Sequence, residues 1–146
     1  MITIMIIIIS FTLITILYGI FHNHTIKYKK NKVLVVDNDP DILDTVKDIL
    51  TIHDLDVKTH ATGLNVPEIV NKYHPNVVLL DIFLPGKSGI EVCKELKEKN
   101  SRLPIIFFSA HAAEKLKSFA MCKANGFIRK PFDIVNLVRT LKLYTK

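Results

Sequence analysis

Beyond residue 31, short apolar runs alternate with stretches in which apolar residues recur every three or four positions. The short runs are typical of strands buried on both faces of a parallel sheet, and the periodic stretches are typical of amphipathic helices. The runs predict five strands, at 32–36, 55–59, 76–81, 104–109 and 126–129. We therefore expect an α/β fold: a doubly wound five-stranded parallel sheet with five helices, preceded by an N-terminal hydrophobic helix.

Capping residues mark where several helices begin. Asp39 and Pro40 supply an N-cap and a proline at the first helical position, and Pro67 suits only the first turn of its helix. Ser88 and Glu91 have the spacing of a capping box, in which each side chain bonds the other residue's backbone amide. The later helices are predicted at 66–73, 88–99, 112–123 and 133–144.

The first 21 residues carry no charged side chain and consist mainly of Ile, Leu, Met and Phe. As a helix they would reach about 30 Å, the thickness of the hydrocarbon layer of a membrane. Lysines follow at once, which favours retention of that end in the cytoplasm. We therefore predict an anchor in the inner membrane at 1–22, a basic linker at 23–31 and a cytoplasmic domain at 32–146.

This segment has two other interpretations. A cleaved signal peptide is disfavoured because no Lys or Arg precedes the apolar run and no small-residue cleavage site follows it. Alternatively, translation starts closer to the first strand and the apolar stretch is not part of the protein. After Met5 the next methionine is Met121, so such a start would need another codon.

Charge and cysteine content restrict the function further. The net charge is +6, from 20 basic and 14 acidic residues. Because the lysines beyond residue 31 are interleaved with acids, the chain lacks the basic stripe of a nucleic-acid-binding protein. Cys93 and Cys122 lie in predicted helices without the close spacing of metal ligands, so we expect reduced, structural thiols.

Polar residues gather where the predicted strands end. In parallel α/β sheets, the carboxyl ends of the strands form one edge, and that edge is where such folds place their chemistry. The residues at these ends are a hydroxyl, an amine and several oxygen-bearing side chains: Asp37, Asn38, Asp39, Asp81, Ser109 and Lys130.

These residues and their surroundings resemble the response-regulator receiver family. The resemblance covers Lys32 to about Lys146 and is specific, because four blocks match in register: 33–40, 77–86, 108–110 and 125–132. It implies that Asp81 accepts a phosphoryl group from a sensor histidine kinase and forms an acyl phosphate. A histidine phosphotransfer protein is a further partner of such relays, and the oligomeric state is left open.

The resemblance also implies a division of roles around Asp81. Mg²⁺ would be held by Asp37, Asn38, Asp81 and the backbone carbonyl of Phe83. Lys130, after a bond to Pro131 that is expected to be cis, would stabilise phosphoryl charge. Ser109 would hydrogen-bond the phosphoryl group while Phe127 turns inward, which switches the face formed by the fourth helix, fifth strand and fifth helix.

Asn38 departs from the family pattern, in which this position is usually a second acid. Because an amide binds Mg²⁺ more weakly than a carboxylate, we expect weakened metal affinity, with Asp39 occupied as a helix cap. We expect self-catalysed phosphotransfer and slow hydrolysis, but no enzymatic turnover of another substrate. The alternatives are a phosphorylation-independent pseudo-receiver and, more remotely, a haloacid dehalogenase-like phosphatase that uses Asp37 and Asp39.

Overall fold

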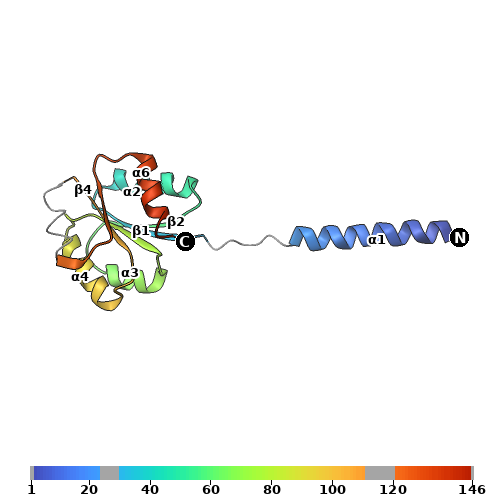
Figure 1. Ribbon diagram of the computed structural model, residues 1–146, viewed down its shortest axis with the longest axis horizontal. Helices are drawn as coiled ribbons and strands as arrows, with labels where there is room; N and C mark the ends of the chain where they lie inside the picture. The colour runs from blue at the N-terminus through green and yellow to red at the C-terminus, as the bar shows by residue number, and fades with distance from the viewer. Residues whose placement is uncertain (1, 24–29, 111–120, 146) are drawn as a thin grey trace.

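The computed structural model describes residues 2–23, 30–110 and 121–145, and it contains one five-stranded parallel sheet in the order β2-β1-β3-β4-β5. The strands are β1 (Lys32–Val36), β2 (Asp56–His60), β3 (Val77–Leu80), β4 (Ile105–Ser109) and β5 (Gly126–Arg129). The helices are α1 (Ile2–Asn23), α2 (Pro40–Ile52), α3 (Val66–Tyr73), α4 (Gly89–Lys99) and α6 (Ile134–Lys142). The predicted doubly wound parallel sheet is confirmed (Figure 1).

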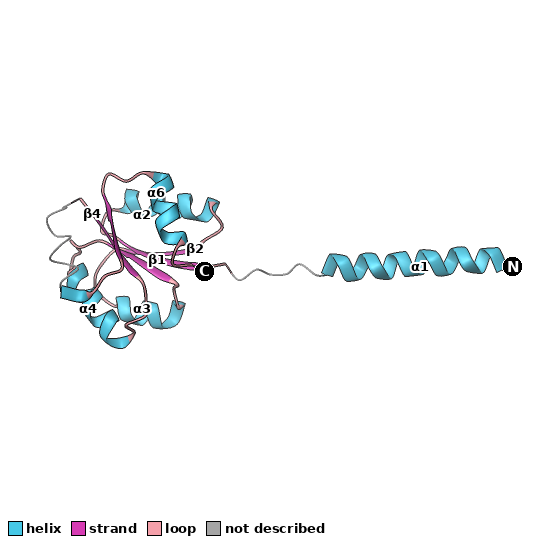
Figure 2. Ribbon diagram, viewed as in Figure 1, coloured by secondary structure: helices cyan, strands magenta, loops and turns pink. Residues whose placement is uncertain are grey.

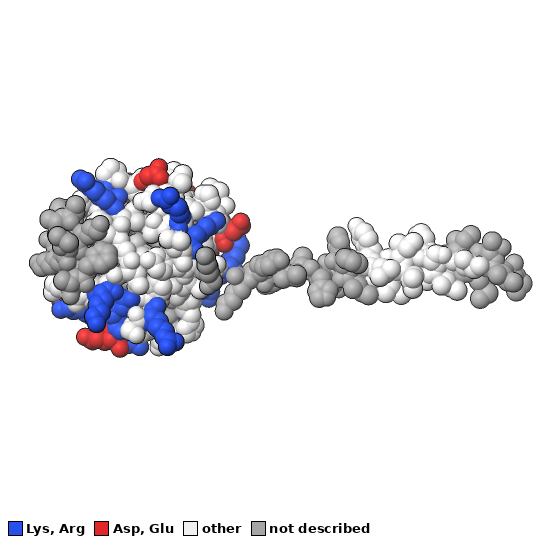
Figure 3. All heavy atoms as spheres, in the orientation of Figure 1, with Lys and Arg blue, Asp and Glu red and all other residues white. Residues whose placement is uncertain are grey.

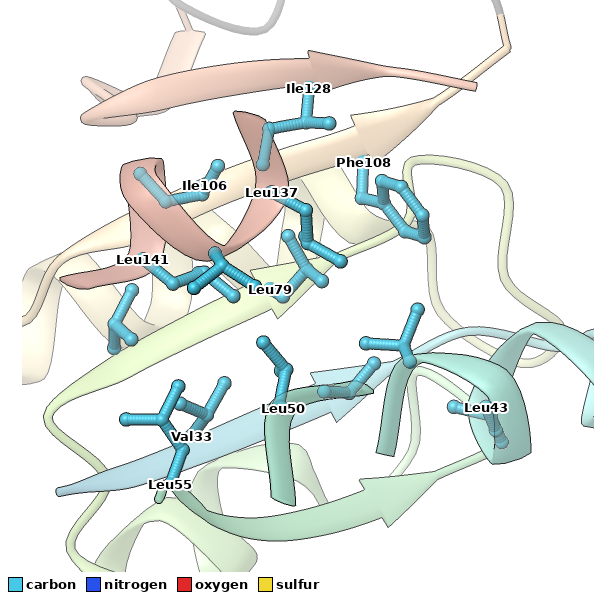
Figure 4. Close-up of a cluster of buried hydrophobic side chains, with 14 residues drawn as sticks. Val33, Leu43, Leu50, Leu55, Leu79, Ile106, Phe108, Ile128, Leu137 and Leu141 are labelled. Atoms are coloured by element: carbon cyan, nitrogen blue, oxygen red, sulfur yellow. The ribbon is translucent and has the colours of Figure 1, made fainter. Parts of the chain in front are cut away.

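The helices form a layer on each face of the sheet, α2 and α6 on one and α3 and α4 on the other (Figure 2). Successive side chains of a strand point to opposite faces, and β1 divides accordingly. Val33 and Val35 pack with α2 and α6, whereas Leu34 and Val36 pack with α3 and α4. Figure 4 shows the first of these layers. The continuous apolar runs are explained by this two-sided burial.

The helix starts follow the predicted caps. Ser88 and Glu91 form the capping box, and a proline occupies the first turn of α3. The predicted helix at 112–123 lies largely outside the described residues. Within the part that is described, Met121 and Cys122 are helical.

The described side chains of α1 are exposed, and Figure 1 shows this helix apart from the sheet. No helix among residues 2–23, 30–110 and 121–145 combines the length and apolar character that crossing a membrane requires. The predicted anchor is therefore not supported.

The prediction of reduced cysteines is wrong in this structure. Cys93, on the buried face of α4, and Cys122, just before β5, form a disulfide with a Cα–Cα distance of 5.8 Å. Both residues belong to the core layer under α3 and α4. Their separation of 29 positions gave no sign of this contact, because a disulfide depends on tertiary proximity rather than on sequence spacing.

Basic and acidic side chains are intermingled on the face drawn in Figure 3, without a continuous basic stripe.

The first turn of α4 is pressed against the backbone that follows β3. Gly89 N donates to the carbonyl oxygen of Ile82 at 2.9 Å, and a Cβ atom at Gly89 would lie 1.9 Å from the carbonyl oxygen of Asp81. Only a residue without a side chain permits this approach, so the backbone of Asp81 depends on Gly89.

We predict that Gly89→Ala lowers the free energy of unfolding by about 2 kcal/mol, because the backbone must shift to admit the methyl group. Urea denaturation measures the change. Lys94→Ala, at an exposed position of the same helix, is the matched control and should change stability by less than about 0.5 kcal/mol. A Gly89→Ala protein as stable as the control would contradict the close approach.

Candidate functional site

Four strand ends meet at one edge of the sheet and carry the predicted site residues. Asp37 follows β1, Asp81 follows β3, Ser109 ends β4 and Lys130 follows β5. The register pairs Val36 with Leu80, which brings the two aspartates side by side. The edge predicted from the sequence therefore exists, and it collects these residues from four neighbouring strands.

Lys130 joins the two aspartates. Its Nζ donates to Asp37 Oδ2 at 2.5 Å and to Asp81 Oδ2 at 2.8 Å. Asp37 is fully buried and Asp81 is 7% exposed, whereas the Lys130 side chain retains 16% exposure. Two carboxylates held this close, in low dielectric surroundings, repel each other, and the shared ammonium compensates them.

The ring of Phe108 lies against the ammonium group of Lys130. Lys130 Nζ lies 4.7 Å from the centre of this ring, within the range of a cation–π contact. Phe108 in turn contacts Phe132 edge to face, with ring centres 5.1 Å apart. The sequence did not identify Phe108 as part of the site, because its only signal was its place in an apolar strand directly before Ser109.

The electrostatics of Asp37 are dominated by its burial. Burial raises the pKa of Asp37, and the hydrogen bonds from Lys130 and from the backbone of Asp39 oppose the rise without cancelling it. Asp39 N donates to Asp37 Oδ1 at 3.1 Å. Asp37 is thus a carboxyl whose ionised form relies on Lys130.

Asp81 is held at both of its oxygens but keeps some contact with solvent. Phe83 N donates to Asp81 Oδ1 at 3.3 Å, while Lys130 bonds the other oxygen. The side chain of Phe83 is 52% exposed beside it. This arrangement fixes the direction of the carboxylate and leaves an approach from solvent.

Asp39 caps α2, as predicted. Its Oδ1 accepts from Asp41 N at 3.0 Å and from Ile42 N at 3.3 Å. Asn38 is exposed beside it. Because the carboxylate of Asp39 is engaged with backbone amides, it does not replace the missing acid at position 38.

Ser109 is bonded to the backbone of Lys130, and Phe127 lies three residues before Lys130 in the chain. Ser109 is 1% exposed, and its carbonyl oxygen accepts from Lys130 N at 3.0 Å. Phe127, in β5, is half-buried against the layer under α3 and α4. The Lys130–Pro131 bond is cis, as predicted. The switching roles of Ser109 and Phe127 stay predictions.

Asp37 and Asp81 are the carboxylates at this edge that would hold Mg²⁺. The described residues contain no group of three His, Cys, Asp or Glu side chains that would hold a metal. Mg²⁺ is commonly bound through one or two carboxylates completed by water and phosphate oxygens, a requirement that Asp37 and Asp81 satisfy. Asn38 and the Phe83 carbonyl stay predicted ligands.

The chain is similar to known receivers. Residues 33–142 match the family model of the response regulator receiver domain. The receiver domain of BeF3-activated RstA from Klebsiella pneumoniae is 30% identical, with a TM-score of 0.74 over 80% of this chain and 99% of that one. A putative response regulator from Chloroflexus aurantiacus is 26% identical, with a TM-score of 0.74 over 80% and 98%. The chemotaxis protein CheY4 of Vibrio cholerae is 26% identical, with a TM-score of 0.72 over 79% and 98%. The chain therefore belongs to the response-regulator receiver family.

Proposed function

We propose that this protein is a phosphoacceptor of a two-component system or phosphorelay, which receives a phosphoryl group on Asp81 from a sensor histidine kinase. The observation that carries the proposal is the sharing of Lys130 Nζ between Asp37 and Asp81 at the solvent-accessible edge of the sheet. The receiver acts in the cytoplasm, where kinases form phosphohistidine from ATP.

The chemistry is a displacement at phosphorus. A carboxylate oxygen of Asp81 attacks the phosphorus atom, and the bond from phosphorus to the histidine nitrogen breaks. The amide of Phe83 holds Asp81 in position for this attack. Lys130 already lies against Asp81, so its charge is preorganised for the incoming phosphoryl oxygens. Mg²⁺, held by Asp37 and Asp81, would supply further neutralisation of the negative charge at this site.

The same site gives the proposed switch. Ser109 donates its hydroxyl to the phosphoryl group and Phe127 turns inward, which alters the face around β5 and α6. That face then contacts the next protein of the pathway, and a histidine phosphotransfer protein can instead take the phosphoryl group from Asp81. The reaction is self-catalysed and is followed by slow hydrolysis, without turnover of another substrate.

The contacts of Asp39 argue against the phosphatase alternative. In haloacid dehalogenase-like enzymes the second acid of the motif handles protons at the substrate. Here the Asp39 carboxylate accepts hydrogen bonds from two amides in the first turn of α2, which commits it to capping.

We predict that the full chain, incubated with acetyl phosphate and Mg²⁺, gains one phosphoryl group by intact mass, because Asp81 is oriented beside Lys130. Asp81→Asn keeps the shape and removes the nucleophile, and it should gain none. An unmodified wild-type protein at high Mg²⁺ would favour the phosphorylation-independent pseudo-receiver, and turnover of a generic phosphate ester would revive the phosphatase.

Lys130→Met should lower the free energy of unfolding by about 3 kcal/mol at pH 7.5, because two neighbouring carboxylates lose their shared cation. The loss should be smaller at pH 5. Without Lys130, the raised pKa of Asp37 rises further. A carboxyl group whose folded pKa is raised stabilises the protein at low pH. This contribution is lost as the pH rises through the folded pKa.

Urea denaturation at the two pH values measures this effect. Lys47→Met removes an exposed lysine from α2 and serves as the control, with a change below about 0.5 kcal/mol at either pH. A Lys130→Met protein with the same stability loss at both pH values would show that the carboxylates do not depend on the ammonium.

Asn38→Asp should tighten Mg²⁺ binding, since a carboxylate adds a negative charge where the family usually has one. One negative charge about 4 Å from a divalent ion in water contributes about 2 kcal/mol, or about thirtyfold in Kd. Calorimetric titration measures the affinity. Asn71→Asp makes the same charge change at an exposed position of α3 and should leave the Kd unchanged. Equal affinities for Asn38→Asp and wild type would exclude position 38 from the metal site.

A further inference from the structure

The disulfide ties the segment that leads into β5 to a helix on the same face of the sheet. Cys93 lies on α4 and Cys122 lies four residues before Gly126, the first residue of β5. The bond therefore closes a loop that contains β4 and Ser109. The disulfide therefore lies next to β4, which carries Ser109, and β5, which leads to Lys130.

The proposed function places this bond in the cytoplasm, and the inference rests on that proposal. Cytoplasmic thiols are kept reduced, so a disulfide that forms there is usually transient and responds to the redox state. A cysteine pair that is able to bond at this position is therefore better suited to a reversible role than to permanent stabilisation.

A groove of about 360 Å³ gives a route to the bond. It is lined by Cys122 and Met121, by the lysines Lys94, Lys97 and Lys123, and by one acid, Glu98. Three lysines against one glutamate make the groove attractive to small anions. Lys97 is fixed there by bonds to neutral oxygens, including Asn125 Oδ1 at 2.7 Å and the Leu103 carbonyl at 2.9 Å.

We propose that Cys93 and Cys122 form a reversible redox site that exchanges with small anionic thiols in this groove, and that the closed disulfide restrains phosphorylation of Asp81. Cys122 lines the groove and is 5% exposed, whereas Cys93 does not line it and is fully buried. The geometry directs an attacking thiolate to the sulfur of Cys122.

The exchange consists of two thiol–disulfide steps. The small thiol releases its proton to water, and its thiolate bonds to Cys122 Sγ while the Sγ–Sγ bond breaks and Cys93 leaves as a thiolate. A second small thiolate attacks the small-molecule sulfur of this mixed disulfide and releases Cys122. Both cysteine thiolates take protons. Two electrons pass to the protein, the small thiols leave as their own disulfide, and the reverse sequence closes the bond.

The restraint follows from the limited reach of a disulfide. Bonded cysteines keep their Cα atoms about 4.4 to 6.8 Å apart, so the segment at Cys122 cannot move far from α4. Asn125 also forms two hydrogen bonds with β4. Its backbone amide donates to Ile105 O at 2.8 Å, and its side-chain oxygen accepts from Ile105 N at 3.0 Å. The strand that follows, β5, ends at Arg129, directly before Lys130.

The bond is closed in the arrangement in which Lys130 contacts Asp81 Oδ2 directly. When Asp81 bears a phosphoryl group, the contact of Lys130 passes from Asp81 Oδ2 to the phosphoryl oxygens, and the proposed switch turns Phe127 of β5 inward. A disulfide that favours the first arrangement opposes the second, and the coupling is reciprocal.

The first test concerns exchange alone and needs no phosphorylation. The full chain is equilibrated with reduced or oxidised glutathione, its thiols are trapped with a maleimide, and intact mass counts them. We expect two trapped thiols in excess reduced glutathione and none in excess oxidised glutathione. A bond that stays closed in reduced glutathione, or thiols that never form it, would overturn the redox site.

The role of the groove is tested by rates. Lys94→Gln combined with Lys123→Gln should slow reduction by glutathione, an anion, by about fivefold, and leave reduction by neutral 2-mercaptoethanol within about twofold. Lys47→Gln combined with Lys72→Gln removes the same charge from exposed positions of α2 and α3 as a control. Equal slowing of both thiols, or no slowing, would remove the groove from the mechanism.

The restraint is tested with acetyl phosphate on the oxidised and the dithiothreitol-reduced full chain. The reduced protein should be phosphorylated at least about fivefold faster. A protein carrying both Cys93→Ser and Cys122→Ser should match the reduced protein in either buffer, although the wild-type comparison does not depend on that variant. Equal rates overturn the restraint. Absence of phosphorylation in both states refutes the proposed function and the restraint together, whereas the thiol counts still decide the redox site.

Discussion

A single ammonium group shared by two buried carboxylates organises the functional edge of this protein. Lys130 contacts Asp37, which is fully buried, and Asp81, which is nearly so. Removing two carboxylates from water is costly, and Asp37, whose pKa is raised by burial, relies on the cation for its charge. The contact also holds the ends of β1, β3 and β5 together. The interaction that stabilises this edge thus holds the Asp81 carboxylate beside a cation and in partial contact with solvent, which a phosphoacceptor requires.

The fold was largely predictable because burial on both faces of a parallel sheet leaves a strong signal. β1, β3 and β4 read as uninterrupted apolar runs, and their predicted positions agree with the structure within one residue at either end. β2 begins one residue later than predicted. Leu55, which is only 4% exposed, packs into the core from the position just before the strand. The last helix is shorter than predicted, since Asp133 caps it and Leu143 is exposed.

The candidate site was predictable in its membership but not in its contacts. Strand ends in a parallel sheet share an edge, so the positions of Asp37, Asp81 and Lys130 followed from the strand pattern and the family resemblance. The sequence could not show that Lys130 contacts both aspartates or rests on Phe108, because these contacts depend on side-chain direction. The disulfide was missed for a related reason: Cys93 and Cys122 meet only after α4 and the segment before β5 pack together.

The most direct measurement locates the phosphoryl group. The phosphorylated full chain is treated with borohydride, which reduces an aspartyl phosphate to homoserine, and its peptides are sequenced by mass spectrometry. Homoserine at position 81 alone is the expected result, because Asp81 is the carboxylate that is both oriented and accessible at this edge. Homoserine at position 37, or at neither aspartate after a phosphoryl group has been gained, would contradict the assignment of Asp81 as the phosphoacceptor.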